Sequence, residues 1–304
     1  MTSPEQTVVV GVDGSAGSDQ AVLWAVDLAV HRKLRLRIVH GLRLTVPQHG
    51  VGIAETGVLF DAIQENGGRI LRDAVRLARQ VDENVPITTV MPTEPPVSLL
   101  TDLSRSVRMI VVGHTGDGGF TGMLVGSTAT AVVSHAHCPV LVVRGRFGPA
   151  GVPEEGPVVV GIDGSPVSEA ALALAFDEAS VRRVPLVALH AWHDDTHGSM
   201  YSANRFLAAW DSIEVGEQQL LAERLAGWQE KYPDVDVRRA LVRDRPRHAL
   251  MEWSATAQLV VVGSHGRGGF RGMLLGSTSQ ALVQHAQCPV LVVRPRPADD
   301  APTA

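Results

Sequence analysis

Two copies of one glycine pattern, Gly-x-x-Gly-x9-Gly-Ser, begin at Gly113 and Gly263, and each follows directly on a short apolar run. Glycines between a strand and a helix allow backbone N–H groups to close on an anion. The helix that follows adds unpaired N–H groups and the positive end of its dipole. The pattern therefore predicts a loop that holds phosphate groups, and it occurs twice.

A second polar loop, Asp-Gly-Ser, follows the first apolar run of each half, with its aspartates at Asp13 and Asp163. An aspartate in this position can form a turn or cap a helix. It can also accept a hydrogen bond from a base amine or a ribose hydroxyl, or face a metal-bound phosphate. In a parallel sheet of strand order 3-2-1-4-5, the loops after strands 1 and 4 face one crevice. We therefore favour the ligand role for both aspartates.

Two familiar nucleotide motifs do not fit these loops. A Walker A loop needs a lysine on the phosphates, but Lys33 and Lys231 are the only lysines and lie far from the glycines in sequence. A dinucleotide fingerprint needs Gly-x-Gly-x-x-Gly directly after the first strand, where this chain has Gly-x-Asp-Gly-Ser.

The chain is a duplication with a constant offset of 150 residues. Val8–Ser15 returns as Val158–Ser165, and Cys138–Val143 returns as Cys288–Val293. We expect one domain over residues 1–146, a linker over 147–156, a second domain over 157–296 and a tail over 297–304.

Short Val/Ile/Leu runs alternate with helical patterns in each half, which is typical of βαβ units and a parallel sheet covered on both faces. Strands are predicted near 7–12, 35–40, 86–90, 108–113 and 139–143, and again near 157–162, 186–190, 235–241, 258–263 and 289–293. Helices are predicted near 18–32, 58–82, 96–106 and 127–136, and again near 168–182, 205–231, 246–256 and 277–286. The fold class is therefore α/β, with five parallel strands in each half.

Composition excludes several other classes. The formal net charge of −5 has no long block of one sign, which argues against a nucleic-acid partner. The start does not look like a signal peptide, and no apolar run approaches the roughly 18 residues of a membrane helix, so we expect a cytoplasmic protein. Cys138 and Cys288, each before a proline, are interpreted as small buried residues rather than a disulfide.

Val-Val-Val-Gly-x-Asp-Gly-Ser, Gly-x-x-Gly-x9-Gly-Ser-Thr and Cys-Pro-Val-Leu-Val-Val together resemble the universal stress protein family, in the tandem arrangement seen among actinobacteria. The resemblance implies two tandem Rossmann-like domains of the adenine nucleotide alpha hydrolase type. Each would bind ATP in its crevice, with Mg²⁺ held through the phosphates. It also implies pairing through strand 5, either in a homodimer or between the two domains of one chain.

The candidate nucleotide-binding residues are those of the two loops and of the start of the last helix in each half. In the first half they are Gly11, Asp13, Gly14, Ser15, Gly113, His114, Thr115, Gly116, Asp117, Gly118, Gly119, Met123, Gly126, Ser127 and Thr128. In the second half they are Gly161, Asp163, Gly164, Ser165, Asp194, Gly263, Ser264, His265, Gly266, Arg267, Gly268, Gly269, Leu275, Gly276, Ser277 and Thr278. We assign no catalytic residue and no protein ligand to a metal.

The two loops differ in charge, because Arg267 of the second half replaces Asp117 of the first. An arginine neutralises phosphate, whereas a carboxylate repels it unless a cation intervenes. We expect the second site to bind more tightly and the first to depend more on Mg²⁺. His40 and His190, at the ends of their strands, could approach the base or simply be satisfied where they lie.

Three functions use such loops: nucleotide-dependent regulation through an unidentified protein partner, slow ATP hydrolysis or phosphoryl transfer, and binding of a cyclic nucleotide. Phosphoryl transfer needs positioned cations and a base near the γ-phosphate. The loops offer only Asp117 and Arg267 for this chemistry, and these lie in different sites. We therefore expect binding, with at most slow hydrolysis.

Overall fold

The computed structural model describes residues 6–43, 53–115, 126–145, 155–192, 203–266 and 274–294. Within the helices, the side chains of 53–56, 203–214 and 220 lie outside this description.

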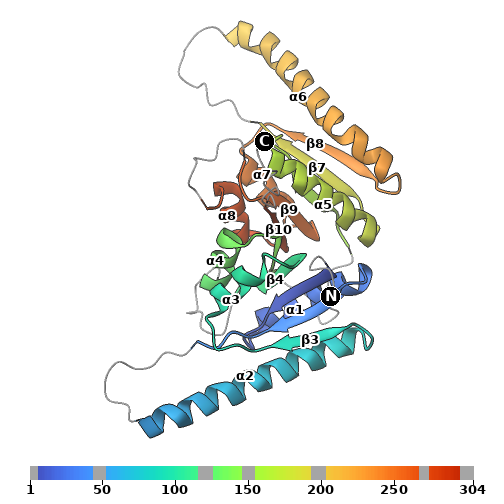
Figure 1. Cartoon of the computed structure of the whole chain (residues 1–304). Helices are drawn as coiled ribbons and strands as arrows, with labels where there is room; N and C mark the ends of the chain where they lie inside the picture. Colours follow the sequence, from blue (N-terminus) through green and yellow to red (C-terminus); the bar gives the residue numbers. More distant parts are fainter. Residues whose placement is uncertain are drawn as a thin grey trace, which may run out of the picture.

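Strands and helices alternate in both halves, in agreement with the sequence prediction (Figure 1). The first half contains β1 (Thr7–Gly11), α1 (Ala16–His31), β2 (Arg35–Val39), α2 (Ile53–Val81), β3 (Ile87–Val90), α3 (Pro96–Leu103), β4 (Met109–Gly113), α4 (Ser127–His135) and β5 (Val140–Val143). The second half contains β6 (Val158–Gly161), α5 (Pro166–Arg182), β7 (Leu186–Ala191), α6 (Ala203–Lys231), β8 (Val237–Val242), α7 (Pro246–Trp253), β9 (Leu259–Gly263), α8 (Ser277–His285) and β10 (Val290–Val293).

All ten strands form one sheet in the order β3-β2-β1-β4-β5-β10-β9-β6-β7-β8. Each half is parallel throughout and has the predicted order 3-2-1-4-5. The halves meet where β5 and β10 pair antiparallel, with Leu141 opposite Leu291. Strand 5 of each half therefore pairs within the chain. Figure 1 shows α2 beside β3 at one end of the molecule and α6 beside β8 at the other.

The central strands are buried on both faces, which explains their unbroken runs of valine. Val8 and Val10 of β1 belong to the core that packs under α1 and α2, whereas Val9 belongs to the core under α3 and α4. Both cores continue from one half into the other, so the two repeats share their hydrophobic interior.

A charged network joins the C-terminal ends of α1 and α5. Arg32 contacts Asp177 at 3.0 Å and Glu178 at 2.8 Å, and Arg182 contacts Asp27 at 2.9 Å and Glu178 at 3.1 Å. The two arginines occupy matching positions of the repeat, and each reaches the aspartate of the other half. The halves are thus linked by ion pairs as well as by the sheet.

Both cysteines are buried and reduced, as expected for structural residues. Burial raises the pKa of the Cys288 thiol to about 12, so this thiol stays protonated. Of the helices in the described ranges, none has the length and apolar character required to cross a membrane.

Candidate functional site

Each half contains a cleft at the carboxyl ends of its strands, where the loops after the first and fourth strands meet. The cleft of the first half has a volume of about 490 Å³ and that of the second about 550 Å³, sizes typical of small-molecule sites. Predicted residues that line the first cleft are Gly11, Asp13, Gly113, Thr115, Gly126, Ser127 and Thr128. Those that line the second are Gly161, Asp163, Gly263, His265, Gly266, Gly276, Ser277 and Thr278.

The strand-1 aspartates line these clefts and also shape their own turns. Asp13 Oδ1 accepts hydrogen bonds from Ser15 N at 3.1 Å and Ser15 Oγ at 2.6 Å. Asp163 Oδ1 accepts one from Ser165 N at 2.9 Å. The turn-forming interpretation of the Asp-Gly-Ser loop is therefore confirmed, and the ligand role stays a prediction for a carboxylate that lines the cleft.

Glycine provides a left-handed backbone in the Asp-Gly-Ser loop and allows close approach at the end of the fourth strand and just after it. Gly14 and Gly164 have φ of 85° and 78°, in the left-handed region that other residues rarely adopt. A Cβ on Gly266 would overlap the Asp163 carboxylate, and one on Gly113 would lie 2.5 Å from the backbone of Gly17. The two walls of each cleft are therefore in direct contact.

The last helix of each half points an uncapped N-terminus into its cleft. The N-caps are Gly126 for α4 and Gly276 for α8, and neither has a side-chain capping bond. Gly276 N donates to Ser264 O at 2.7 Å, which fixes the start of α8 against the end of β9. Among the described residues, no side chain caps the first-turn N–H groups of these helices, and such groups suit an anion in the cleft.

Some predicted residues support the clefts without lining them. Gly14, Ser15, Gly164 and Ser165 build the turn, His114 and Ser264 continue from the fourth strand, and buried Leu275 precedes α8. His40 and His190 also lie behind the wall, where each Nδ1 contacts the carbonyl of the residue before the aspartate at 2.7 Å. Each histidine is therefore satisfied by a contact with the loop from outside the cleft. This agrees with the simpler interpretation, in which the histidines do not approach the base.

The predicted residues of the glycine loops proper fall outside the described residues. They are Gly116, Asp117, Gly118, Gly119 and Met123 in the first half, and Arg267, Gly268 and Gly269 in the second. Asp194, which follows β7, also falls outside the described residues.

The structure adds an apolar wall that sequence reasoning missed. It is formed by the ends of β2 and β7 and by the start of α3 and α7. Its residues are Val39, Gly41, Pro96, Leu99 and Leu100 in the first cleft and Leu189, Ala191, Pro246 and Leu250 in the second. Pro96 and Pro246 repeat at the same offset as the glycines, which was an available signal. Apolar residues of this kind are indistinguishable from core residues until the sheet is assembled.

The surroundings of the two clefts differ in charge. Behind the first loop, burial and the charges of Asp73 and Asp13 raise the pKa of Asp19. At the matching position of the second half, Glu169 forms an ion pair with Arg224 of α6. The acid at this position thus pairs with an arginine in the second half, whereas in the first half Arg69 and Arg76 pair with the neighbouring Asp73. Arg43 is a cation of the first cleft, but it follows β2, on the side opposite the glycine loop.

Comparison with known proteins gives a consistent relationship for both halves. The model of the universal stress protein family matches residues 5–144 and again residues 156–294. A universal stress protein of Mycobacterium tuberculosis is 42% identical over 295 residues, which cover 94% of this chain and 96% of the relative. A second one from the same organism is 41% identical over 290 residues, with the same shares covered.

A solved structure that spans both halves shows the same fold. A universal stress protein of Archaeoglobus fulgidus superposes with a TM-score of 0.67 at 18% identity, over 97% of this chain and all of that one. A universal stress protein solved in complex with cAMP is 29% identical, but it covers 47% of this chain with a TM-score of 0.35. The family model and the mycobacterial relatives together show that this chain, with its two tandem domains, belongs to the universal stress protein family.

Proposed function

We propose that each half binds an adenine nucleotide, with ATP as the ligand, and that its occupancy regulates stress adaptation or growth through a protein partner. One observation supports this most strongly. In both halves a carboxylate at the end of the first strand faces an uncapped helix N-terminus across a cleft of nucleotide size. Two such clefts in matching positions are hard to explain as packing alone.

The chemistry of the walls suggests an orientation for the nucleotide. The aspartate is suited to the ribose or base, because a carboxylate repels phosphate. The N–H groups at the start of α4 or α8 are suited to the phosphates. The apolar wall that contains Leu100 or Leu250 offers a surface on which a flat base can pack. Mg²⁺ would be held mainly by the phosphates and would neutralise part of their charge.

The second site is proposed to be the stronger. The replacement of Asp117 by Arg267 supports this ranking. So does the pairing of Glu169 with Arg224, because Asp19 at the matching position has no arginine within salt-bridge distance among the described residues. We expect the first site to require more Mg²⁺ than the second, because Asp117 adds a negative charge to its loop where the second loop has Arg267.

The proposal is tested by nucleotide titration of the full chain. Gly266→Ala places a methyl group on Asp163 and should abolish binding at the second cleft only. Gly113→Ala should do the same at the first, where the methyl group meets Gly17. Matched controls are Gly227→Ala and Gly57→Ala, since a Cβ at either position meets nothing within 4 Å. Failure of the unaltered chain to bind any adenine nucleotide would refute the proposal.

Two alternatives use the same clefts. A slow ATPase or phosphotransferase would convert bound ATP over repeated turnovers with Mg²⁺, and Gly266→Ala should remove its turnover in the second cleft. A cyclic-nucleotide module would bind cAMP more tightly than ATP, and competition between the two ligands measures this preference. Intact ATP after long incubation, together with displacement of cAMP by ATP, is the result expected for the proposed function.

A further inference from the structure

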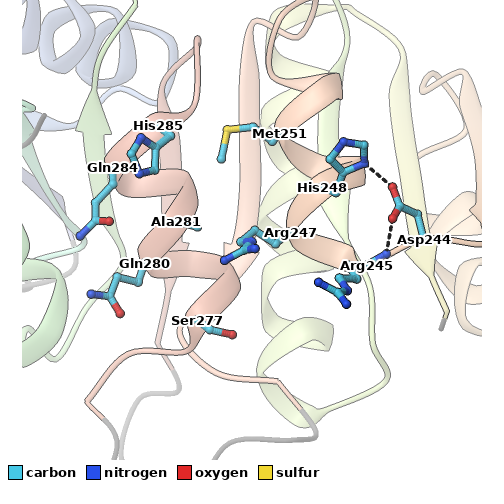
Figure 2. Close-up of a pocket in the computed structure, with 10 residues that line it drawn as sticks. All are labelled: Asp244, Arg245, Arg247, His248, Met251, Ser277, Gln280, Ala281, Gln284 and His285. Atoms are coloured by element: carbon cyan, nitrogen blue, oxygen red, sulfur yellow. Dashed lines mark hydrogen bonds and ion pairs between the residues drawn. The ribbon is translucent and has the colours of Figure 1, made fainter. Parts of the chain in front are cut away.

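A second hollow of the second half lies outside the cleft, between α7 and α8. It has a volume of about 900 Å³ and is called here the α7–α8 groove. Figure 2 shows Arg247 between the two helices and Arg245 at the same end of the groove as Ser277. This end of the groove therefore gathers two guanidinium groups beside the first residue of α8.

The α7–α8 groove is adjacent to the nucleotide cleft. Ser277 lines both hollows, and Pro246, which lies between Arg245 and Arg247 in sequence, lines the cleft. The first turn of α7 thus presents Pro246 to the cleft and its two arginines to the groove. The phosphates of a ligand that contact the N-terminus of α8 would therefore lie next to the end of the groove that contains the two arginines.

The charges at this end favour an anion. In the described part of the chain, neither Arg245 nor Arg247 has a carboxylate within salt-bridge distance. The N-termini of α7 and α8 both lack side-chain capping bonds and add their positive dipole ends. Of the nearby acids, Asp244 accepts hydrogen bonds from Arg245 N at 2.6 Å and from His248, and Glu252 lies 3.8 Å from His248 Nε2. The His248 ring offsets part of their charge when it is protonated.

The first half has no counterpart of this cationic end. The positions that match Arg245, Arg247 and His248 are occupied by Pro95, Val97 and Ser98. The two arginines are therefore found in the second half alone and are not repeated in the first.

From this arrangement we propose that Arg245, Arg247 and the N-terminus of α8 form a subsite for the terminal phosphates of the nucleotide in the second cleft. The inference rests on the proposed function and adds a ligand class to it. The second half would prefer adenine nucleotides with three or more phosphates over AMP. The first half would lack this dependence on phosphate chain length.

The test compares AMP, ATP and adenosine 5′-tetraphosphate by calorimetric titration of the full-length chain. Arg245→Gln with Arg247→Gln should weaken ATP and the tetraphosphate at the second site by about tenfold, as expected for the loss of charge-assisted bonds, and leave AMP unchanged. Arg238→Gln with Arg239→Gln, at exposed positions of β8, removes the same charge elsewhere. The first cleft serves as an internal reference, and lysine at 245 and 247 should restore part of the preference.

Several outcomes would overturn the proposal. Equal weakening of all three ligands would show that the arginines only maintain the cleft. The same loss in the β8 control would show a general effect of charge. Unchanged affinity for every ligand would remove the subsite and leave the groove as a surface for an acidic partner. An unaltered chain that binds AMP and ATP equally at both clefts would refute the subsite while leaving nucleotide binding intact, whereas no binding of any nucleotide would refute the proposed function as well.

Discussion

Asp13 and Asp163 show how one side chain can form a turn and a wall of the cleft together. Each accepts hydrogen bonds within its own turn, from Ser15 or Ser165, and each faces its cleft. Because these bonds are made before any ligand arrives, the carboxylate is already oriented. Such preorganisation reduces the entropy lost on binding.

His114 carries a pH dependence that Ser264, at the matching position of the second half, cannot have. Burial, followed by the positive charge of Arg144, lowers the pKa of His114, with the Val143 carbonyl acting in the opposite direction. The unfolded chain therefore takes up a proton that the folded chain resists. Stability is expected to fall as the pH drops through the ordinary histidine range, near 6.5.

His114→Ser, which introduces the residue found at Ser264, should remove this acid sensitivity. Urea unfolding of the nucleotide-free chain at pH 7 and at pH 5.5 measures the effect. The variant should lose less stability between the two pH values than the unaltered chain. An equal loss in both would show that His114 carries no such penalty.

At the scale of elements, α1 and α5 begin at the clefts and end at the junction between halves. Ser15 and Ser165 are their N-caps, with each Oγ accepting from an N–H three residues on at 3.2 Å. Ser15 Oγ has further contacts, with Asp13 Oδ1 at 2.6 Å and Thr115 O at 3.3 Å, so it also connects the two walls of the first cleft.

Ser15→Ala and Ser165→Ala form a matched pair of cap variants. Each should cost about 1 kcal/mol through the lost cap. Ser15→Ala should also weaken nucleotide binding in the first cleft, because Asp13 loses its shortest donor. Denaturant unfolding and nucleotide titration of both variants separate these effects. An equal loss of affinity in the two clefts would contradict the added role of Ser15.

At the scale of the whole molecule, the ion network between α1 and α5 adds to the sheet and the shared cores that join the halves. The side chain of Glu178 is 2% exposed and lies between Arg32 and Arg182, and the Arg182 guanidinium carbon lies 4.4 Å from the centre of the Trp24 ring. Leu28 occupies the position that matches Glu178, so this third carboxylate is particular to the second half. Removing one charge from such a cluster leaves its partners buried without a counter-charge, which is destabilising.

Arg182→Met should therefore destabilise the chain by about 3 kcal/mol, since it leaves Glu178 and Asp27 short of a cation. Arg238→Met is the control, because Arg238 is 63% exposed and its ion pair with Asp236 should contribute less than about 1 kcal/mol. Thermal and urea unfolding measure both variants. Similar small losses in the two would show that the network adds little to the junction.

Pairing of β5 with β10 covers the apolar edge strand that each half would expose if it stood alone. All four residues of each strand are buried, yet within its own half each strand is the last of the sheet. An exposed apolar edge of this kind is a template for association. The duplication provides the complementary edge in the same chain, and the sheet continues through the junction.

Much of this architecture was determined by the sequence. Valine runs alternating with helical patterns predicted the strands and helices, and the constant offset predicted two like halves. The glycines and aspartates predicted two loops that share a crevice. These predictions succeeded because they rest on local chemistry. Hydrophobic periodicity, turn-forming residues and glycines are all recognisable from residues that are neighbours in the sequence.

Tertiary structure decided what depends on segments distant in sequence. Pro96 and Leu100 looked like ordinary helix residues until the sheet brought α3 to the cleft beside Asp13. Arg245 and Arg247 became a cationic end only because α7 packs beside α8. Glu178 became a shared partner of two arginines only when the halves joined. Sequence periodicity does not predict these contacts. Each depends on how whole helices and strands pack together, and not on the residues next to it in the sequence.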